Sequence, residues 1–148
     1  MKLADIIAEA HRKQDFGGLV EAIPYARFLG ITVAERDGDL IAQLAFDEKL
    51  IGNTLLPAIH GGVIGAFLET AAILKLLWTR ESVHVPKTIT VTIDYLRSAG
   101  PRPTYARGII TKLGTRVANV RAEAWQTDPT KPVAAANANF LLPSAAEE

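Results

Sequence analysis

Hydrophobic residues recur at helical spacing at the start of this chain and at the two-residue spacing of strands further along it. The first dozen residues carry apolar side chains three and four positions apart, which predicts a short amphipathic helix ending near Gly17-Gly18. Between residues 27 and 46, two apolar runs flank Asp37-Gly38-Asp39, a turn sequence typical of a β-hairpin. We therefore expect a packing helix followed by two paired strands.

The most apolar stretch extends from Gly61 to Trp78 and predicts a long helix that is buried on nearly all sides. After Pro86, alternating apolar residues and intervening turns predict four strands, over residues 88–96, 104–113, 116–126 and 132–142. The first of these reads as a half-buried strand. In the last two, alternate positions from Ala118 to Ala124 and from Ala134 to Phe140 form one face of mostly small residues, which lets a helix pack closely on the sheet.

This order of elements predicts an α+β fold in which an antiparallel sheet of about five or six strands wraps around a long central helix. With 148 residues and 49% hydrophobic content, the chain has the size and composition of a single domain. We expect one domain over residues 1–148, with the helix of residues 1–17 appended to it.

The overall charge excludes several classes of partner. Sixteen basic and sixteen acidic residues cancel, so we expect neither nucleic acid nor a membrane surface as a partner. The chain has no cysteine, and its three histidines lack metal-ligand spacing, so no metal site is predicted. We expect no apolar run to approach the roughly 20 residues of a membrane span, and the N-terminus does not resemble a signal peptide. A cytoplasmic protein is the default expectation.

The sequence His60-Gly61-Gly62 stands at the head of the predicted core helix, where glycine is unusual. Close packing against the sheet can explain any single glycine. Two adjacent glycines in the first turn instead indicate that another group approaches the backbone there. The amides there have no partner within the helix, and the helix dipole favours negative charge. This arrangement suits an oxyanion, and we expect His60 to orient the loop rather than act as a base.

Glu69 lies on the same helix face as Gly61 and Gly65, at four-residue spacing, within an apolar run. One reading is structural: the Glu69 side chain reaches solvent or pairs with Lys75 or Arg80. The other is that Glu69 is a functional carboxylate. We favour the second reading, because burying an unpaired carboxylate is costly. Eight residues of helix separate Gly61 from Glu69 by about 12 Å, too far for one reacting carbon. Two antiparallel helices across a two-fold axis remove this difficulty, so we expect an obligate dimer.

Six basic residues and no acid occur between residues 97 and 121. Such a cluster could bind the phosphates of a small ligand, although charged strand edges give an equally good reading of each residue alone. The cluster consists of Arg97, Arg102, Arg107, Lys112, Arg116 and Arg121.

The segments HGGVIGAFLETA, VTIDYLRSAG and GTRVANVRAEAW resemble the hot-dog fold thioesterases of the PaaI-like (phenylacetate-pathway) family, over roughly residues 23 to 142. The most specific element is His-Gly-Gly followed by an acid nine residues after the histidine. The resemblance implies an acyl-coenzyme A thioesterase without a cofactor, coenzyme A being part of the substrate. It also implies a homodimer with one continuous sheet, and pairing of two dimers into a homotetramer.

By this resemblance Gly61 supplies the amide that polarises the thioester carbonyl, and Glu69 of the facing subunit is the nucleophile or the base that activates water. His60 holds the loop. The family usually has an amide side chain six residues before the histidine; Thr54 stands there, so Asn53, one residue earlier, is assigned that role. Ile73 replaces a hydroxyl found in some relatives, and Thr70 is the nearby substitute. Substrate or coenzyme A binding is assigned to Gly62, Thr70, Arg97, Thr115 and Arg116.

Two alternatives stay open at this point. A hot-dog hydratase or dehydratase also uses a histidine and an acid on the central helix, but typically has a His-Phe-Pro-Gly loop where this chain has His-Gly-Gly. A non-catalytic acyl-CoA-binding protein is the second alternative, because the loop differs from the family pattern at Thr54, Pro57 and Ile73.

Overall fold

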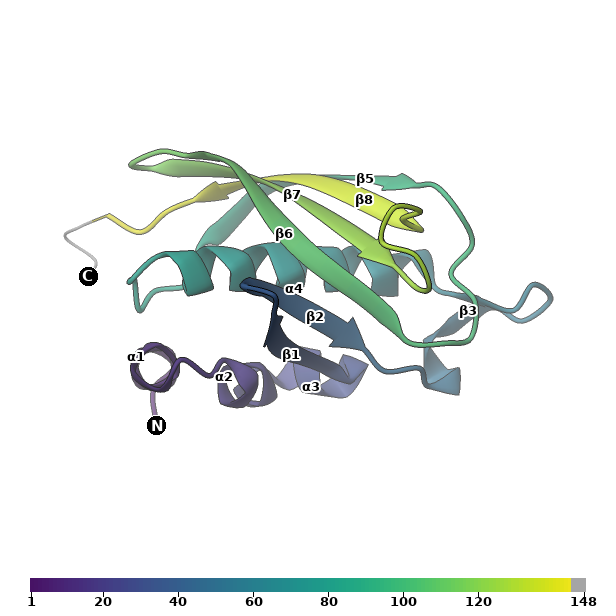
Figure 1. Cartoon of the computed structure of the whole chain (residues 1–148), viewed down its shortest axis with the longest axis horizontal. Coiled ribbons are helices and arrows are strands. Elements are labelled where there is room, and N and C mark those ends of the chain that lie inside the picture. The colour runs from purple at the N-terminus through teal and green to yellow at the C-terminus, as the bar shows by residue number, and fades with distance from the viewer. Residues whose placement is uncertain (145–148) are drawn as a thin grey trace.

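The structure is a computed structural model that describes residues 1–144; residues 145–148 of the predicted domain lie outside the described part. Six strands form one antiparallel sheet in the order β1-β2-β6-β7-β8-β5. The sheet curves over the long helix α4 (Figure 1). The strands are β1 (Ile31–Arg36), β2 (Asp39–Leu44), β5 (Lys87–Tyr95), β6 (Thr104–Leu113), β7 (Val117–Trp125) and β8 (Ala134–Leu141), and α4 is Gly61–Thr79.

The predicted elements after residue 60 agree closely with the structure. Helix α4 ends one residue later than expected, β6 has its predicted bounds, and β5, β7 and β8 differ by at most two residues at either end. Alternate residues of β7 and β8 form the expected buried face. Because most of these side chains are alanine or valine, α4 packs closely beneath the sheet, and the predicted α+β fold class is confirmed.

The N-terminal region differs from the prediction. Helix α1 (Leu3–Lys13) ends before the two glycines, and Gly17 begins a second helix, α2 (Gly17–Ala22), which precedes α3 (Pro24–Leu29). Residues 27–29 were predicted as the start of a strand, but they close α3. Two signals explain α3: proline at the first helical position has a suitable φ, and Gly30 ends the helix with φ 79°.

The hairpin turn was predicted correctly. Asp37 and Gly38 both have positive φ, 51° and 78°, as the two central residues of a type I′ turn require. Strands β1 and β2 then pair from Arg36↔Asp39 to Ile31↔Leu44. In Figure 1 the three N-terminal helices lie on the β1 side of the molecule, away from β5, and their buried side chains contribute to the core.

Helix α4 has both the length, 19 residues, and the apolar composition of a membrane-spanning helix, so the expectation that no segment approaches this size was wrong. In the fold, however, its apolar residues form the centre of the core. Phe67, Leu68, Leu74, Leu76 and Leu77 are all at most 1% exposed. Burial within the protein therefore accounts for the composition of this helix.

Strand β5 is more exposed than the predicted half-buried strand. It lies at the outer edge of the sheet, with only β8 beside it. Val91 and Ile93 are partly buried, whereas Tyr95 on the same face is 57% exposed and Ile89, at a bulge in the strand, is 54% exposed. Among residues 1–144 the strand therefore has an unpaired edge and an apolar face that is covered only in part.

A second, two-stranded sheet precedes α4 and was not predicted. Strand β3 (Ile51–Asn53) follows the 3-10 helix η1 (Glu48–Leu50) and pairs with β4 (Ala58–Ile59). The backbone N–H of His60 also donates to the carbonyl of Leu50 at 2.8 Å. These contacts fix the chain where it enters α4.

Candidate functional site

His60 caps the N-terminus of α4. Its Nδ1 accepts a hydrogen bond of 2.9 Å from the backbone N–H of Gly62, so one of the amides that a helix start leaves unpaired is satisfied by a side chain. The structure thus gives His60 an orienting position. It also means that the Gly62 amide, which was assigned to substrate binding, is already occupied.

The amide of Gly61 is different. Within residues 1–144 its N–H has no hydrogen-bond partner, while its carbonyl accepts a hydrogen bond of 2.7 Å from the hydroxyl of Tyr95. An unpaired N–H at the positive end of a 19-residue helix can stabilise an oxyanion. Gly61 is therefore the backbone donor that the first turn leaves available.

Side chains of the same chain lie close to the glycines in the first turns of this helix. A β-carbon on Gly61 would lie 3.3 Å from the Tyr95 ring, and one on Gly62 would lie 2.9 Å from His60 Nδ1. A β-carbon on Gly65 would approach Cδ1 of Ile93 to 2.7 Å. The groups that approach the paired glycines are thus Tyr95 and His60 of the same chain, and the approach of a ligand to them stays a prediction.

A cavity of about 470 Å³ lies beside this first turn. Gly61 and Ile64 line it from α4, and Tyr95, Arg97 and Ser98 line it from the end of β5 and the segment that follows. Two of the predicted site residues, Gly61 and Arg97, are therefore brought together. Glu69 is not among the residues that line this cavity.

Glu69 lies two turns further along α4 and is half-buried. Within residues 1–144 its carboxylate has no hydrogen bond or ion pair. Lys75, one of the two predicted structural partners, bonds to Asp39 at 2.8 Å instead. Within residues 1–144 the Glu69 carboxylate is therefore available to a ligand or to a partner subunit, as the predicted role requires.

Two further predicted site residues are engaged in local hydrogen bonds. Asn53 Oδ1 accepts the N–H of Leu55 at 3.0 Å and so shapes the loop before β4. The hydroxyl of Thr70 donates to the carbonyl of Ala66, one turn back, at 2.7 Å. Asn53 faces Ala58 across the small sheet, which places it near the entry to α4.

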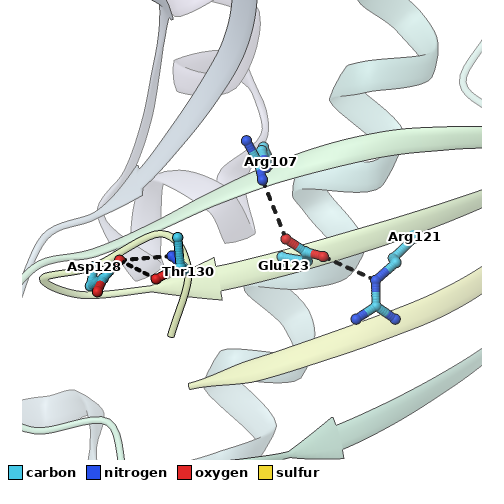
Figure 2. Close-up of polar contacts among 5 residues, drawn as sticks. All are labelled: Arg107, Arg121, Glu123, Asp128 and Thr130. Atoms are coloured by element: carbon cyan, nitrogen blue, oxygen red, sulfur yellow. Dashed lines mark hydrogen bonds and ion pairs between the residues drawn. The ribbon is translucent and has the colours of Figure 1, made fainter. Parts of the chain in front are cut away.

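The predicted basic cluster does not form in one chain. Arg107 and Arg121 flank Glu123, at 3.5 Å and 3.1 Å, so an acid just beyond the cluster pairs with both (Figure 2). Arg97 lies near one end of the sheet, beside a row of paired residues on three strands: Tyr95, Ala134 and Ala124. Arg116 lies beside another such row: Lys87, Leu141 and Val117. Seven residues of strand separate these rows, about 23 Å. Arg97 and the pair Thr115-Arg116 therefore lie at opposite ends of the sheet.

The turn between β7 and β8 borders Arg97. Arg97 donates to the carbonyl of Pro132 at 2.6 Å, which holds its guanidinium near this turn. Asp128 accepts hydrogen bonds from the Thr130 hydroxyl at 2.7 Å and backbone N–H at 2.9 Å (Figure 2). These bonds lower the pKa of Asp128, and the charges of Lys131 and Arg97 lower it further. The carboxylate therefore stays ionised at neutral pH.

Sequence reasoning missed Tyr95, Ser98 and Gly52 as residues of this region. Tyr95 ends the period-two pattern of β5, so its hydroxyl could have been suspected of reaching the helix start. Gly52 lies against His60. The sequence gives no signal of this contact, because it depends on the pairing of β3 with β4, which was not predicted.

Comparison with known proteins adds independent information. The family model described as thioesterase superfamily matches residues 56–143. A curated protein of Salmonella typhimurium, named medium/long-chain acyl-CoA thioesterase YigI, is 29% identical, over 81% of this chain and 86% of its own length.

Two solved structures have the same fold. A protein of Chromobacterium violaceum is 40% identical, with a TM-score of 0.79 over 95% of this chain and 98% of its own. A phenylacetic acid degradation-related protein of Ralstonia eutropha is 24% identical, with a TM-score of 0.72 over 81% of this chain and 90% of its own.

Proposed function

Because the chain belongs to the thioesterase superfamily, we propose that it hydrolyses the thioester bond of an acyl-coenzyme A to a free acid and coenzyme A. The predicted thioesterase family and hot-dog fold class are thereby confirmed. One observation supports the proposed chemistry above the others: an unpaired amide at Gly61 and an unpaired carboxylate at Glu69 lie on the same face of α4.

In the proposed reaction Glu69 attacks the thioester carbonyl carbon, either directly or through a water molecule that it deprotonates. Negative charge develops on the carbonyl oxygen, where the N–H of Gly61 stabilises it. The C–S bond then breaks and coenzyme A leaves as a thiolate, which needs no strong general acid. After direct attack, water hydrolyses the acyl-enzyme in a second step and regenerates the carboxylate.

The proposed site contains residues of two subunits. Tyr95 faces Gly61 and Ile93 faces Gly65, so α4 runs antiparallel to β5 and Glu69 is level with Val91. A two-fold axis level with Gly65 and Ile93 would bring Glu69 of one subunit level with Gly61 of the partner subunit. Pairing of the free edges of β5 supplies such an axis and would cover Ile89 and Tyr95.

The same pairing joins the two halves of the basic cluster. Antiparallel β5 strands would place Arg116 of one subunit at the same end of the combined sheet as Arg97 of the partner subunit. The phosphates of coenzyme A could then contact both, with Thr115 beside them. The homodimer and this phosphate site are proposals of ours, as are the further pairing into a homotetramer and the cytoplasmic location.

The first substrates to test are medium- and long-chain acyl-CoA esters, the class in the name of the Salmonella protein. Release of free thiol from a panel of acyl chain lengths and aromatic acyl groups tests the proposal directly. Two parallel measurements, hydration of an enoyl-CoA and equilibrium binding of a non-hydrolysable acyl-CoA, distinguish the alternatives. Tight binding or hydration without thiol release contradicts the proposed function.

A further inference from the structure

Tyr95 and His60 hold opposite ends of one peptide group. The Tyr95 hydroxyl donates to the Gly61 carbonyl at 2.7 Å, and His60 Nδ1 accepts from the Gly62 N–H at 2.9 Å. The Gly61 carbonyl and the Gly62 N–H belong to the same peptide. Each of its two polar atoms is therefore fixed by a side chain, one from β5 and one from the residue before α4.

This peptide joins two glycines, which have the greatest backbone freedom of any residues. The Gly61 N–H belongs to the preceding peptide, whose carbonyl, that of His60, accepts the N–H groups of Val63 at 3.0 Å and Ile64 at 3.2 Å. The Tyr95 ring adds a packing restraint, because its atoms come within 3.3 Å of the place of a β-carbon on Gly61. The neighbouring N–H of Gly61 is the unpaired donor, and a donor to an oxyanion is effective only when its direction is set in advance.

We infer that Tyr95 is a positioning residue of the reaction: with His60 it holds the Gly61–Gly62 peptide, so that both peptides flanking the Cα of Gly61 are fixed and the Gly61 N–H keeps its direction. This inference rests on the proposed thioesterase function. Tyr95 acts through the backbone of Gly61, and its exposed ring also forms one wall of the cavity beside that amide.

The test is Tyr95→Phe, which removes the hydroxyl and keeps the ring. We expect kcat on the best acyl-CoA substrate to fall about three- to tenfold, the range of one hydrogen bond, while KM stays within about twofold. Tyr25→Phe is the matched control, because Tyr25 is 57% exposed on α3, stacks on Phe28, and has a hydroxyl without a hydrogen bond within residues 1–144. It should retain wild-type kcat and KM.

A second readout does not depend on activity. Hydrogen exchange of the Gly62 amide, followed by NMR, should be faster in Tyr95→Phe than in the wild type or in Tyr25→Phe, because the peptide loses one of its two restraints. Unchanged exchange, or a wild-type kcat in Tyr95→Phe, overturns the inference. Failure of the wild type to hydrolyse any thioester overturns the proposed function instead, and the exchange rates still decide whether Tyr95 positions the peptide.

Discussion

Gly52 lies directly against His60: a β-carbon on Gly52 would come within 2.7 Å of His60 Cα and 2.8 Å of its Cβ and Cδ2. A side chain at position 52 therefore has to displace the backbone or the ring of His60. Because His60 Nδ1 accepts the Gly62 N–H, such a shift changes the first turn of α4. The small β3–β4 sheet thus acts on the Gly61 amide through His60.

We expect Gly52→Ala to lower kcat by at least roughly tenfold and to destabilise the fold by about 1–3 kcal/mol, the usual cost of overpacking. Thiol release and thermal unfolding measure the two effects. Gly18→Ala is the matched control, since a β-carbon on Gly18 meets no atom within 4 Å. Wild-type kcat in Gly52→Ala would show that the position of His60 does not influence the reaction.

Glu69→Gln tests the proposed attacking group. The amide has nearly the same shape but cannot take up a proton or attack as a carboxylate, so we expect turnover to fall at least roughly 100-fold with little change in stability. Glu21→Gln, an exposed acid on α2, is the control and should be fully active. An unchanged rate in Glu69→Gln rules out the proposed mechanism.

The sequence predicted the sheet and the central helix because local periodicity and tertiary packing agree there. From Ala118 to Ala124 in β7 and from Ala136 onward in β8, for example, mostly small apolar residues alternate with polar ones and are buried in that same alternation. The prediction failed for α2 and α3, where short helices depend on contacts with β1 and α4 rather than on a long amphipathic repeat.

The candidate site was predicted less completely, for a different reason. Spacing along α4 placed Gly61 and Glu69 on one face, since helix geometry is regular. The basic cluster was inferred from neighbourhood in sequence, but an antiparallel sheet sends Arg97 and Arg116 to opposite ends. The hydrogen bond from Tyr95 to Gly61 joins residues 34 positions apart, and no local pattern encodes it.

A complementation experiment tests whether the site is shared between subunits. Gly61→Ala places a methyl group 3.3 Å from the Tyr95 ring and so disturbs the turn that carries the Gly61 N–H, and Glu69→Gln removes the carboxylate. Each variant alone should therefore be nearly inactive. In a mixed dimer, one of the two sites combines an intact Gly61 with an intact Glu69. Unfolding and refolding the two variants together should therefore restore about a quarter of the wild-type activity, because about half of the dimers are mixed.

The control for this experiment is each variant refolded alone, which should stay inactive. Activity that remains absent in the mixture, although mixed dimers form, would place Gly61 and Glu69 of one site in the same chain. The separation of about 12 Å along one helix makes that arrangement difficult for a single reacting carbon.

The position of the two-fold axis can be tested with a single cysteine, because the chain has none. If Glu69 is level with Gly61 of the partner subunit, the axis passes at the level of Ile93, and the two copies of that residue face each other across the paired β5 strands. Directly opposed residues in such a pair have Cα atoms about 4.5–5.5 Å apart, within the range of a disulfide.

We expect Ile93→Cys to form a covalent dimer under mild oxidation, seen on a non-reducing gel. Ile89→Cys, at the bulge of β5, is the control. It is four residues from the axis, so the two copies would be about 26 Å apart and should not cross-link. Rapid cross-linking of Ile89→Cys but not of Ile93→Cys would shift the register of the two strands and separate Glu69 from the Gly61 amide that it is proposed to serve.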